Sequence, residues 1–316
     1  MDRSVAVTGA TGFIGGALVR RLVAEGWRVR VLVRHLPTNP DLAALPIETV
    51  LGSLDDRESL RELVRGTHAV VHTAGLVKAR SRKEFFDANA AGVARLAEAA
   101  AEQSPGPRVI HISSLAAREP ALSSYAASKR AGEEALAQTG DSLSWTILRP
   151  PAVYGPRDPS TLIFFRWIAK GIGPLPAPET ARLSLLHVDD LGQAILAVLT
   201  SGDVTAGGTY ELDDGHPGGY SWRAMAEIAG QHLGEHPRMV RIPRPLLLGV
   251  AYINTLAGLV SGRAPVLSPG KVREICHPNW VCRNNRLAEQ TNWRPRLSLK
   301  DGFADAIGWY REKKCL

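Results

Sequence analysis

The sequence predicts an α/β fold in which a doubly wound parallel sheet is joined to a smaller, mostly helical C-terminal lobe. Short runs of β-branched apolar residues alternate with amphipathic stretches through the first 150 residues. The first apolar run, 4–7, leads directly into the glycine-rich segment 8–15, and apolar residues at helical spacing follow it. A strand, a glycine-rich turn and a helix in this order are typical of a Rossmann-type sheet.

The same alternation continues along the chain and then changes. The predicted strands are 28–33, 47–51, 69–72, 108–112 and 144–148, and the predicted helices are 85–101 and 124–137. From Pro150 a proline-rich stretch breaks the pattern, which returns as a strand at 184–187, a helix at 190–199 and a strand at 209–212. We therefore expect a Rossmann domain over 1–150, rejoined by about 182–213, and a lobe formed by 151–181 and 214–316.

Composition narrows the function classes. The chain has 38 basic and 31 acidic residues, and its net charge of +7 favours an anionic ligand or surface. The arginines are spread along the chain without a basic block interleaved with aromatics, which argues against nucleic-acid binding. Cys276, Cys282 and Cys315 lack metal-ligand spacing, and no apolar signal segment follows Arg3. We therefore expect reduced thiols, no bound metal and a cytoplasmic location.

The glycine-rich segment has the properties of a dinucleotide-binding turn. Gly9, Gly12 and Gly15 follow a GxxGxxG pattern, which lets the backbone turn tightly and approach a ligand closely. The N-terminus of the next helix offers unpaired N–H groups and a positive dipole end to a pyrophosphate. Glycines also end strands for purely structural reasons, so the preceding strand and the following helix give the pattern its weight.

A second group of residues indicates proton transfer. Tyr125 and Lys129 are four residues apart in the predicted helix 124–137, so they share one helix face. An ammonium near a phenol lowers the pKa of that phenol toward a useful range, although an exposed pair without function has the same spacing. Ser113 and Ser114 follow the strand 108–112 at the sheet edge where such folds bind ligands. A serine there can polarise a carbonyl or simply cap a turn.

These motifs resemble the short-chain dehydrogenase/reductase superfamily. The resemblance begins with TGATGFIG at 8–15, the Ser-Ser pair and the Tyr125-x-x-x-Lys129 spacing. YAASKRAGE at 125–133, LRPPAVYGP at 148–156, HVDD at 187–190 and NWRPRLSLKDG at 292–302 resemble its extended branch. That branch holds nucleotide-sugar epimerases and dehydratases, dihydroflavonol-type reductases and 3β-hydroxysteroid dehydrogenases. The resemblance covers nearly the whole chain.

The resemblance implies an NAD(P)-dependent enzyme that moves hydride between nicotinamide and a carbon bearing a hydroxyl or carbonyl. It makes Tyr125 the catalytic acid or base, Lys129 its pKa partner and ribose anchor, and Ser114 the group that polarises the carbonyl. It makes the C-terminal lobe the substrate lobe, and a homodimer is usual for similar sequences. Asn89 matches a position tied to strand and cofactor geometry, and a hydrogen bond at a helix start explains it equally well. The residues expected at the cofactor are Gly9, Thr11, Gly12, Phe13, Ile14, Gly15, Arg34, Ala74, Gly75, Tyr125, Lys129, Pro150 and Pro151.

Two features depart from the family pattern. Eleven residues lead from Ser114 to Tyr125, fewer than in the sugar epimerases of the branch, which disfavours a nucleotide-sugar substrate. The second predicted strand ends in Arg34 without the acidic residue that NAD-preferring enzymes place at the ribose 2′-hydroxyl. A guanidinium pairs well with a phosphate, so we expect NADP(H) to be favoured over NAD(H). The alternative is a solvated arginine at the end of a strand.

One segment of the lobe, 245–260, is mostly apolar and is flanked by Arg241, Arg244 and Arg263. Its length of about sixteen residues is short of the ~20 that span a bilayer. The first expectation is a buried helix that packs within the lobe. Two alternatives are a helix that lines a pocket for an apolar steroid-, flavonoid- or acyl-like substrate, and a helix that contacts a membrane surface.

Two classes of function remain at the level of the sequence. The first is the oxidoreductase or epimerase described above, acting on an apolar small molecule or a nucleotide sugar. The second is a non-catalytic dinucleotide-binding sensor or assembly protein on the same fold. The combination of Ser114, Tyr125 and Lys129 argues against the second class, because a pure binder needs no proton relay.

Overall fold

The computed structural model describes residues 3–36, 40–284 and 286–316. The chain divides into two compact units. The first unit contains 1–149, 192–210 and 285–293, and the second contains 150–191, 211–284 and 294–316.

The first unit is built on a seven-stranded sheet with the strand order β11-β6-β5-β4-β1-β2-β3. Its strands are β1 (Ser4–Thr8), β2 (Arg28–Val33), β3 (Ile47–Leu51), β4 (Ala69–His72), β5 (Arg108–Ile112), β6 (Trp145–Arg149) and β11 (Gly208–Glu211). The pairs from β3 through to β6 are parallel. Strand order reverses between β1 and β4, and ligands of such sheets bind at the carboxyl ends beside this reversal. The predicted fold class is confirmed.

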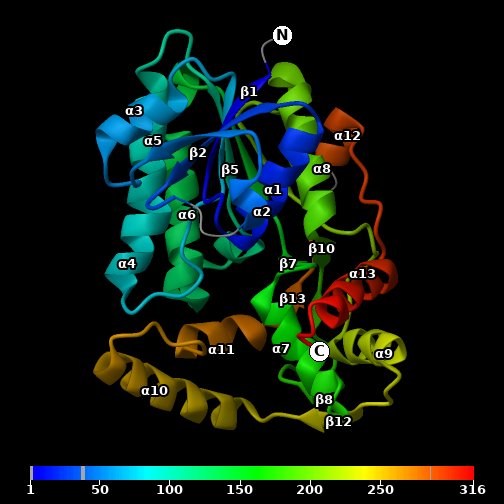
Figure 1. The fold of residues 1–316 in the computed structure, drawn as a ribbon. Coiled ribbons are helices and arrows are strands. Elements are labelled where there is room, and N and C mark those ends of the chain that lie inside the picture. Colours follow the sequence, from blue (N-terminus) through cyan, green and yellow to red (C-terminus); the bar gives the residue numbers. More distant parts are fainter. Residues whose placement is uncertain (1–2, 37–39, 285) are drawn as a thin grey trace. The chain divides into compact units, whose positions relative to one another are not determined.

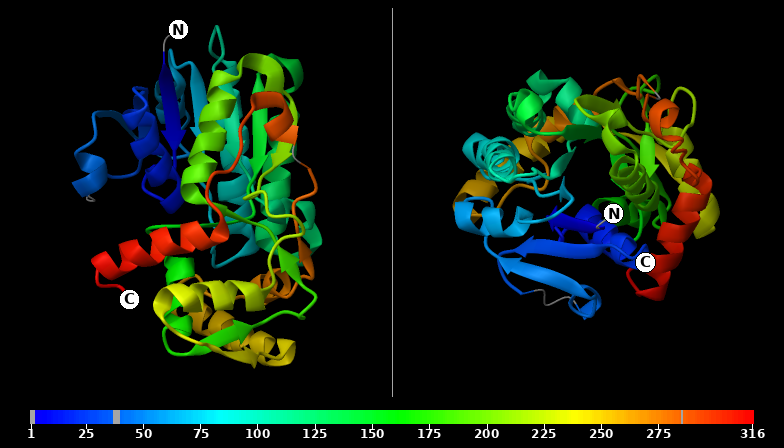
Figure 2. Two further views of the ribbon diagram at one scale, coloured as in Figure 1. Left: turned by 90° about the vertical axis from the view of Figure 1, so that its right-hand side faces the viewer. Right: turned by 90° about the horizontal axis from the view of Figure 1, so that it is seen from above.

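Helices cover both faces of this sheet (Figure 1). They are α1 (Phe13–Ala24), α2 (Pro40–Ala43), α3 (Arg57–Val64), α5 (Gly92–Ala101), α6 (Ser124–Ala137), α8 (Val188–Thr200) and α12 (Arg286–Thr291). α3, α5 and α6 form one layer, and α1 and α8 lie on the opposite face; both layers can be followed in the two views of Figure 2. Leu60, Leu63 and Leu96 from the first layer pack on strand residues such as Val70 and Val109 to form a buried core.

The predicted helix 85–101 is not one regular α-helix. It consists of α4 (Arg82–Phe86), a π-helical turn η1 (Asp87–Ala91) and α5. The wider turn places the Asn89 backbone against α6, where a Cβ on Gly132 would lie 2.2 Å from the Asn89 carbonyl oxygen. Such turns are frequent at functional sites, and no periodic sequence pattern reveals the extra residue.

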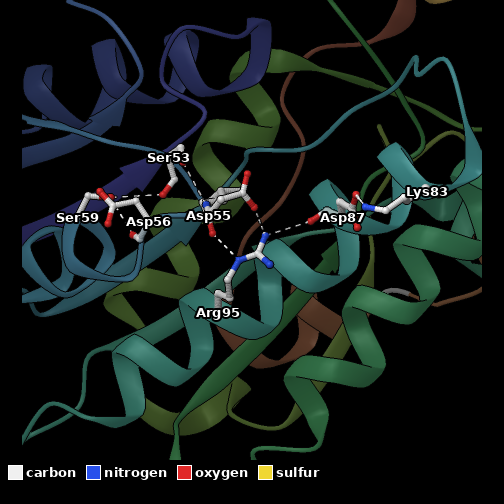
Figure 3. A network of polar contacts seen from close by, with 8 residues as sticks. Ser53, Asp55, Asp56, Ser59, Lys83, Asp87 and Arg95 are labelled. Atoms are coloured by element: carbon white, nitrogen blue, oxygen red, sulfur yellow. Dashed lines mark hydrogen bonds and ion pairs between the residues drawn. The ribbon is translucent and has the colours of Figure 1, made fainter.

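A polar network attaches the loop after β3 to this π-helical turn (Figure 3). Arg95 donates from Nε to the Leu54 carbonyl oxygen at 2.6 Å, and its guanidinium also binds Asp55 and the Asp87 carbonyl oxygen. Lys83 pairs with the Asp87 carboxylate at 2.6 Å. The turn that carries Asn89 is therefore held from the outside by charged side chains and from the inside by Asn89 itself.

The second unit is formed by short strand pairs and helices. Its parallel strand pairs are β7 (Ala152–Tyr154) with β10 (Leu185–His187), β8 (Ile172–Leu175) with β12 (Arg238–Arg241), and β9 (Arg182–Leu183) with β13 (Asn279–Trp280). Its helices are α7 (Pro159–Ile168), α9 (Trp222–Leu233), α10 (Arg244–Ser261), α11 (Pro269–Ile275) and α13 (Leu299–Glu312). An aromatic core joins Tyr154, Phe165, Phe303 and Tyr310. The predicted strand at 184–187 corresponds to β10.

The prediction of a buried helix at 245–260 is wrong. α10 forms at this place, but Ala251 is its one buried residue in the described chain. By length and composition α10 is apolar enough to cross a membrane, and only 6% of it is buried. So much exposed apolar surface on one helix indicates a contact surface.

Candidate functional site

The glycine-rich turn lies between β1 and α1 and has no room for side chains. Gly9 has φ +76°, and a Cβ there would lie 2.7 Å from the backbone nitrogen of Ala74. A Cβ on Gly15 would lie 2.1 Å from the Gly9 carbonyl oxygen. Gly12 donates its N–H to that same oxygen at 2.9 Å and is the N-cap of α1, where no side chain caps the helix. The first turn of α1 thus presents N–H groups and a positive dipole end, which fit a dinucleotide pyrophosphate.

The other predicted residues of this turn have different exposures. Thr11 is exposed, and Phe13 and Ile14 are half-buried at the start of α1. Arg34 is exposed just beyond the end of β2. Leu32 of β2 pairs with Thr8 of β1, so Arg34 lies at the same carboxyl edge of the sheet as the glycine turn.

The segment after β4 joins the glycine turn to α6. Thr73 donates its hydroxyl to the Thr8 carbonyl oxygen at 2.6 Å, which sets Ala74 beside Gly9. A Cβ on Gly75 would lie 2.8 Å from Asn89 Oδ1 and 3.9 Å from Lys129 Nζ. Gly75 is therefore required by close approach, and it brings the backbone next to the lysine ammonium.

The Asn89 side chain connects three segments of this region by hydrogen bonds. Its Oδ1 accepts from the Leu76 N–H at 2.7 Å, and its Nδ2 donates to the Leu76 carbonyl at 2.9 Å and to Ser128 Oγ at 2.9 Å. These bonds connect the loop after β4 with α6, and none of them caps the start of a helix. Of the two explanations given by the sequence, the structure favours the geometric one.

Tyr125 and Lys129 lie on the first turns of α6. Ser123 caps this helix by accepting the Ala126 N–H at 2.9 Å. Lys129 is 5% exposed and donates from Nζ to the Ile112 carbonyl oxygen at 2.7 Å, at the carboxyl end of β5. Burial lowers the pKa of Lys129 to about 8, and the Glu133 carboxylate partly opposes this shift. Tyr125 is half-buried, with its ring edge-on to Phe85 at 6.1 Å between centroids.

The two serines after β5 have different roles in the structure. Ser113 is buried and donates its hydroxyl to Glu133, which also accepts from Arg149 Nε at 2.8 Å. Ser114 is half-buried and accepts the Ala116 N–H at 3.2 Å as the cap of a short 3₁₀ helix, η2 (Leu115–Arg118). That bond uses a lone pair of the hydroxyl, and the hydroxyl proton can still be donated to a carbonyl. Turn capping by Ser114 is therefore compatible with the predicted hydrogen bond to a carbonyl.

Sequence reasoning missed two histidines beneath the site, His72 of β4 and His111 of β5. They are paired in register, and their rings stack at 5.3 Å between centroids. His72 Nδ1 shares a hydrogen bond of 2.7 Å with Thr8 Oγ1. Burial, and secondly the charge of Lys129, lowers the pKa of His72 to about 3 and holds the pKa of His111 well below its usual value. Both rings are therefore neutral near pH 7. The signal available in the sequence was one histidine in each of two mostly apolar predicted strands, 69–72 and 108–112.

The first unit thus brings together the glycine turn, Ala74, Gly75, Ser114 and the Tyr125–Lys129 pair at the carboxyl edge of the sheet. Pro150 and Pro151 follow β6 at the start of the second unit. A buried ammonium one helical turn from a phenol, a donor hydroxyl and a dinucleotide cradle can together bind a carbonyl group and transfer a proton to its oxygen when it is reduced.

Comparison with known proteins gives a consistent result. Residues 5–212 match the model of the NAD dependent epimerase/dehydratase family. The chain is similar to a ceramide reductase of Caulobacter vibrioides, with 39% identity over 97% of this chain and 94% of the relative. It is also similar to the 4-hydroxy-2-methyl-3-oxo-4-farnesyl-3,4-dihydroquinoline-1-oxide ketoreductase of Stigmatella aurantiaca, with 30% identity over 67% of this chain and 68% of the relative.

Among solved structures, the fold is similar to that of the UDP-glucose 4-epimerase of Thermotoga maritima, determined with UDP-glucose. The TM-score is 0.75 at 19% identity, and the match covers 98% of this chain and 99% of the other. At this identity the likeness concerns the fold.

Proposed function

Because the chain belongs to the NAD-dependent epimerase/dehydratase family of extended short-chain dehydrogenases/reductases, we propose that it reduces the ketone of a ceramide-type lipid amide to a secondary alcohol. NADPH is the proposed hydride source. The observation that carries the catalytic part of the proposal is Lys129, which is buried one helical turn beyond Tyr125 and next to Gly75.

In the proposed reaction the bound nicotinamide supplies the hydride that enters the carbonyl carbon. Tyr125 donates its phenolic proton to the carbonyl oxygen, so the product is a neutral alcohol. Ser114 donates a hydrogen bond to the same oxygen and stabilises the negative charge that develops on it. The ammonium of Lys129 favours the phenolate that remains on Tyr125. The glycine turn holds the pyrophosphate against the N-terminus of α1.

Two observations support the substrate class. The ceramide reductase relative matches this chain over nearly its full length, and the ketoreductase relative is named for a farnesyl-bearing ketone. An amide resists reduction by a nicotinamide hydride, so the reducible group of such a lipid is a ketone on its long chain. The short connection between Ser114 and Tyr125 further distinguishes this site from that of the sugar epimerases.

Arg34 supports the choice of cofactor. It is exposed at the carboxyl edge of β2, where the adenosine ribose of a Rossmann-bound cofactor lies. A guanidinium at this place favours a 2′-phosphate over a 2′-hydroxyl.

A substrate comparison with the purified protein tests the proposal. An N-acylated long-chain amino ketone is supplied with NADPH or NADH, and UDP-glucose and UDP-galactose are supplied in parallel. We expect cofactor oxidation that depends on the lipid ketone, with the corresponding secondary alcohol as product. Interconversion of the UDP-sugars without turnover of the lipid ketone would overturn the proposal.

A further inference from the structure

The polarity of α10 is the reverse of that of an ordinary surface helix. Asn254 and Thr255 are half-buried, whereas the side chains that face solvent are apolar. Seven large apolar side chains of α10 are 42–92% exposed: Leu246, Val250, Tyr252, Ile253, Leu256, Leu259 and Val260. Positions 246, 250, 253, 256 and 260 recur at helical spacing, so they form one continuous stripe. A stripe of this size in a folded protein indicates a contact surface.

The charged residues of the segment that contains this stripe are of one sign. The segment 236–273 contains six basic residues and no acidic residue. Arg244 is the first residue of α10, and Arg263 follows its end; both are exposed. Arg241 is also exposed and pairs with Glu179 at 3.5 Å. An apolar stripe with a cation at each end is complementary to a surface that is apolar inside and anionic outside.

We propose that α10 lies in the plane of a membrane containing anionic lipids, with its apolar stripe among the acyl chains and Arg244 and Arg263 at the headgroups. α10 does not span the membrane in this arrangement, because one side of the helix packs against α11 and buries Ala251 fully (Figure 1). Helices bound in this way have one strongly apolar face and basic residues at their polar boundary. Tyr252, which is 58% exposed, has the amphipathic side chain that is enriched at the level of the headgroups.

A second copy of the chain fits the same surface less well. Two α10 helices related by a two-fold axis across them would pack antiparallel, with Arg244 of one copy beside Arg263 of the other. A two-fold axis along them would pack them parallel, with each arginine beside the same arginine of the other copy. Both ends of such an interface would bring like charges together, and the segment 236–273 has no carboxylate to offset them. The charge pattern therefore favours lipid phosphates over a symmetric protein contact.

Vesicle flotation of the full chain tests the proposal. The vesicles consist of phosphatidylcholine alone or of equal parts phosphatidylcholine and phosphatidylglycerol. The test variant is Ile253→Ser with Leu256→Ser, whose side chains are 67% and 63% exposed, so the fold does not depend on them. The matched control is Leu51→Ser with Val204→Ser, two equally apolar residues of the first unit that are each 58% exposed. A third variant, Arg244→Gln with Arg263→Gln, removes the two positive charges at the ends of α10.

We expect the wild type and the control to float with anionic vesicles and the α10 variant to lose about tenfold in vesicle partition, ~1.4 kcal/mol. The arginine variant should lose its preference for phosphatidylglycerol. Failure of the wild type to float, or equal flotation of the α10 variant, would overturn the proposal. A dimer that the α10 variant converts to a monomer, without flotation, would identify a second copy as the occupant. The proposal goes beyond the reductase activity, and a water-soluble short-chain ketone measures that activity without vesicles.

Discussion

Lys129 has the most informative surroundings of any side chain at the site. Its ammonium is buried and donates to the Ile112 carbonyl oxygen. The Gly75 backbone and the Glu133 carboxylate lie near it, and two neutral histidines lie beneath it. Burial makes the charge costly, and the hydrogen bond to the Ile112 carbonyl offsets part of that cost. A lysine held in this way acts on groups at short range, because little water screens its field.

The phenol of Tyr125 is expected to be necessary for turnover. Tyr125→Phe removes the proton donor and leaves the ring against Phe85, so cofactor binding and fold should persist. We expect kcat to fall by ~10²–10⁴, as is typical when a general acid is removed. Steady-state kinetics with the lipid ketone measures this, and a cofactor titration of Tyr125→Phe is the control for binding and fold. An unchanged kcat in Tyr125→Phe would remove Tyr125 from the mechanism.

The lowered pKa of Lys129 predicts a pH-dependent contribution to stability. The folded protein releases this proton at about pH 8, and the unfolded chain releases it near the ordinary lysine pKa of 10.5. Between these values the unfolded chain binds more protons, so the free energy of unfolding should rise with pH in this window. Denaturant titrations of the wild type and of Lys129→Met measure the effect. Their difference should grow in favour of the wild type from about pH 8 to 10.5, and a constant difference would contradict the account.

Arg34 carries a prediction about the cofactor. If its guanidinium binds a 2′-phosphate, NADPH should bind more tightly than NADH, and Arg34→Ala should erase the difference. Arg34→Lys keeps the charge without the forked geometry of the guanidinium. Its preference for NADPH should therefore lie between that of the wild type and that of Arg34→Ala. Fluorescence titration of each variant with both cofactors decides the point. Equal affinities in the wild type would show that Arg34 is simply solvated.

Among the elements, the turn from β1 into α1 tolerates little change. A Cβ on Gly15 would lie 2.1 Å from the Gly9 carbonyl oxygen, so Gly15→Ala must displace the turn. We expect a destabilisation of ~1–3 kcal/mol and loss of cofactor binding. Gly308→Ala in α13 is the matched control, because a Cβ there meets no atom within 4 Å and should stabilise the helix by ~0.5–1 kcal/mol. Denaturant unfolding and a cofactor titration measure both variants.

Regular elements were well predicted because their signals are local. The strands at 28–33, 47–51, 69–72 and 108–112 and the helix at 124–137 have the predicted bounds. The π-helical turn η1 was missed because it depends on Asn89 and on the approach of α6, two features separated in sequence. Similarly, the stacked histidines depend on the register of β4 and β5. α10 was predicted to be buried because its composition is that of a core helix, and composition does not say what lies beside it.

The molecule as a whole combines a cofactor-binding unit of a widespread fold with a second unit that bears an exposed apolar helix. The residues assigned to proton transfer all belong to the first unit, and their arrangement follows from a parallel sheet whose strands end at one edge. The fold alone is shared with a UDP-glucose 4-epimerase, and an epimerisation makes no net change in oxidation state. The central claim is therefore that hydride leaves the cofactor and stays on the product.

Isotope transfer tests this claim most directly. NADPH carrying deuterium in both C4 positions of the nicotinamide is incubated with the enzyme and the long-chain ketone, and the lipid product is analysed by mass spectrometry. The account predicts one deuterium on the new carbinol carbon for each NADPH oxidised, and almost no alcohol product in the same time with Tyr125→Phe. A product without deuterium, or isomerised substrate with no net oxidation of NADPH, would contradict it.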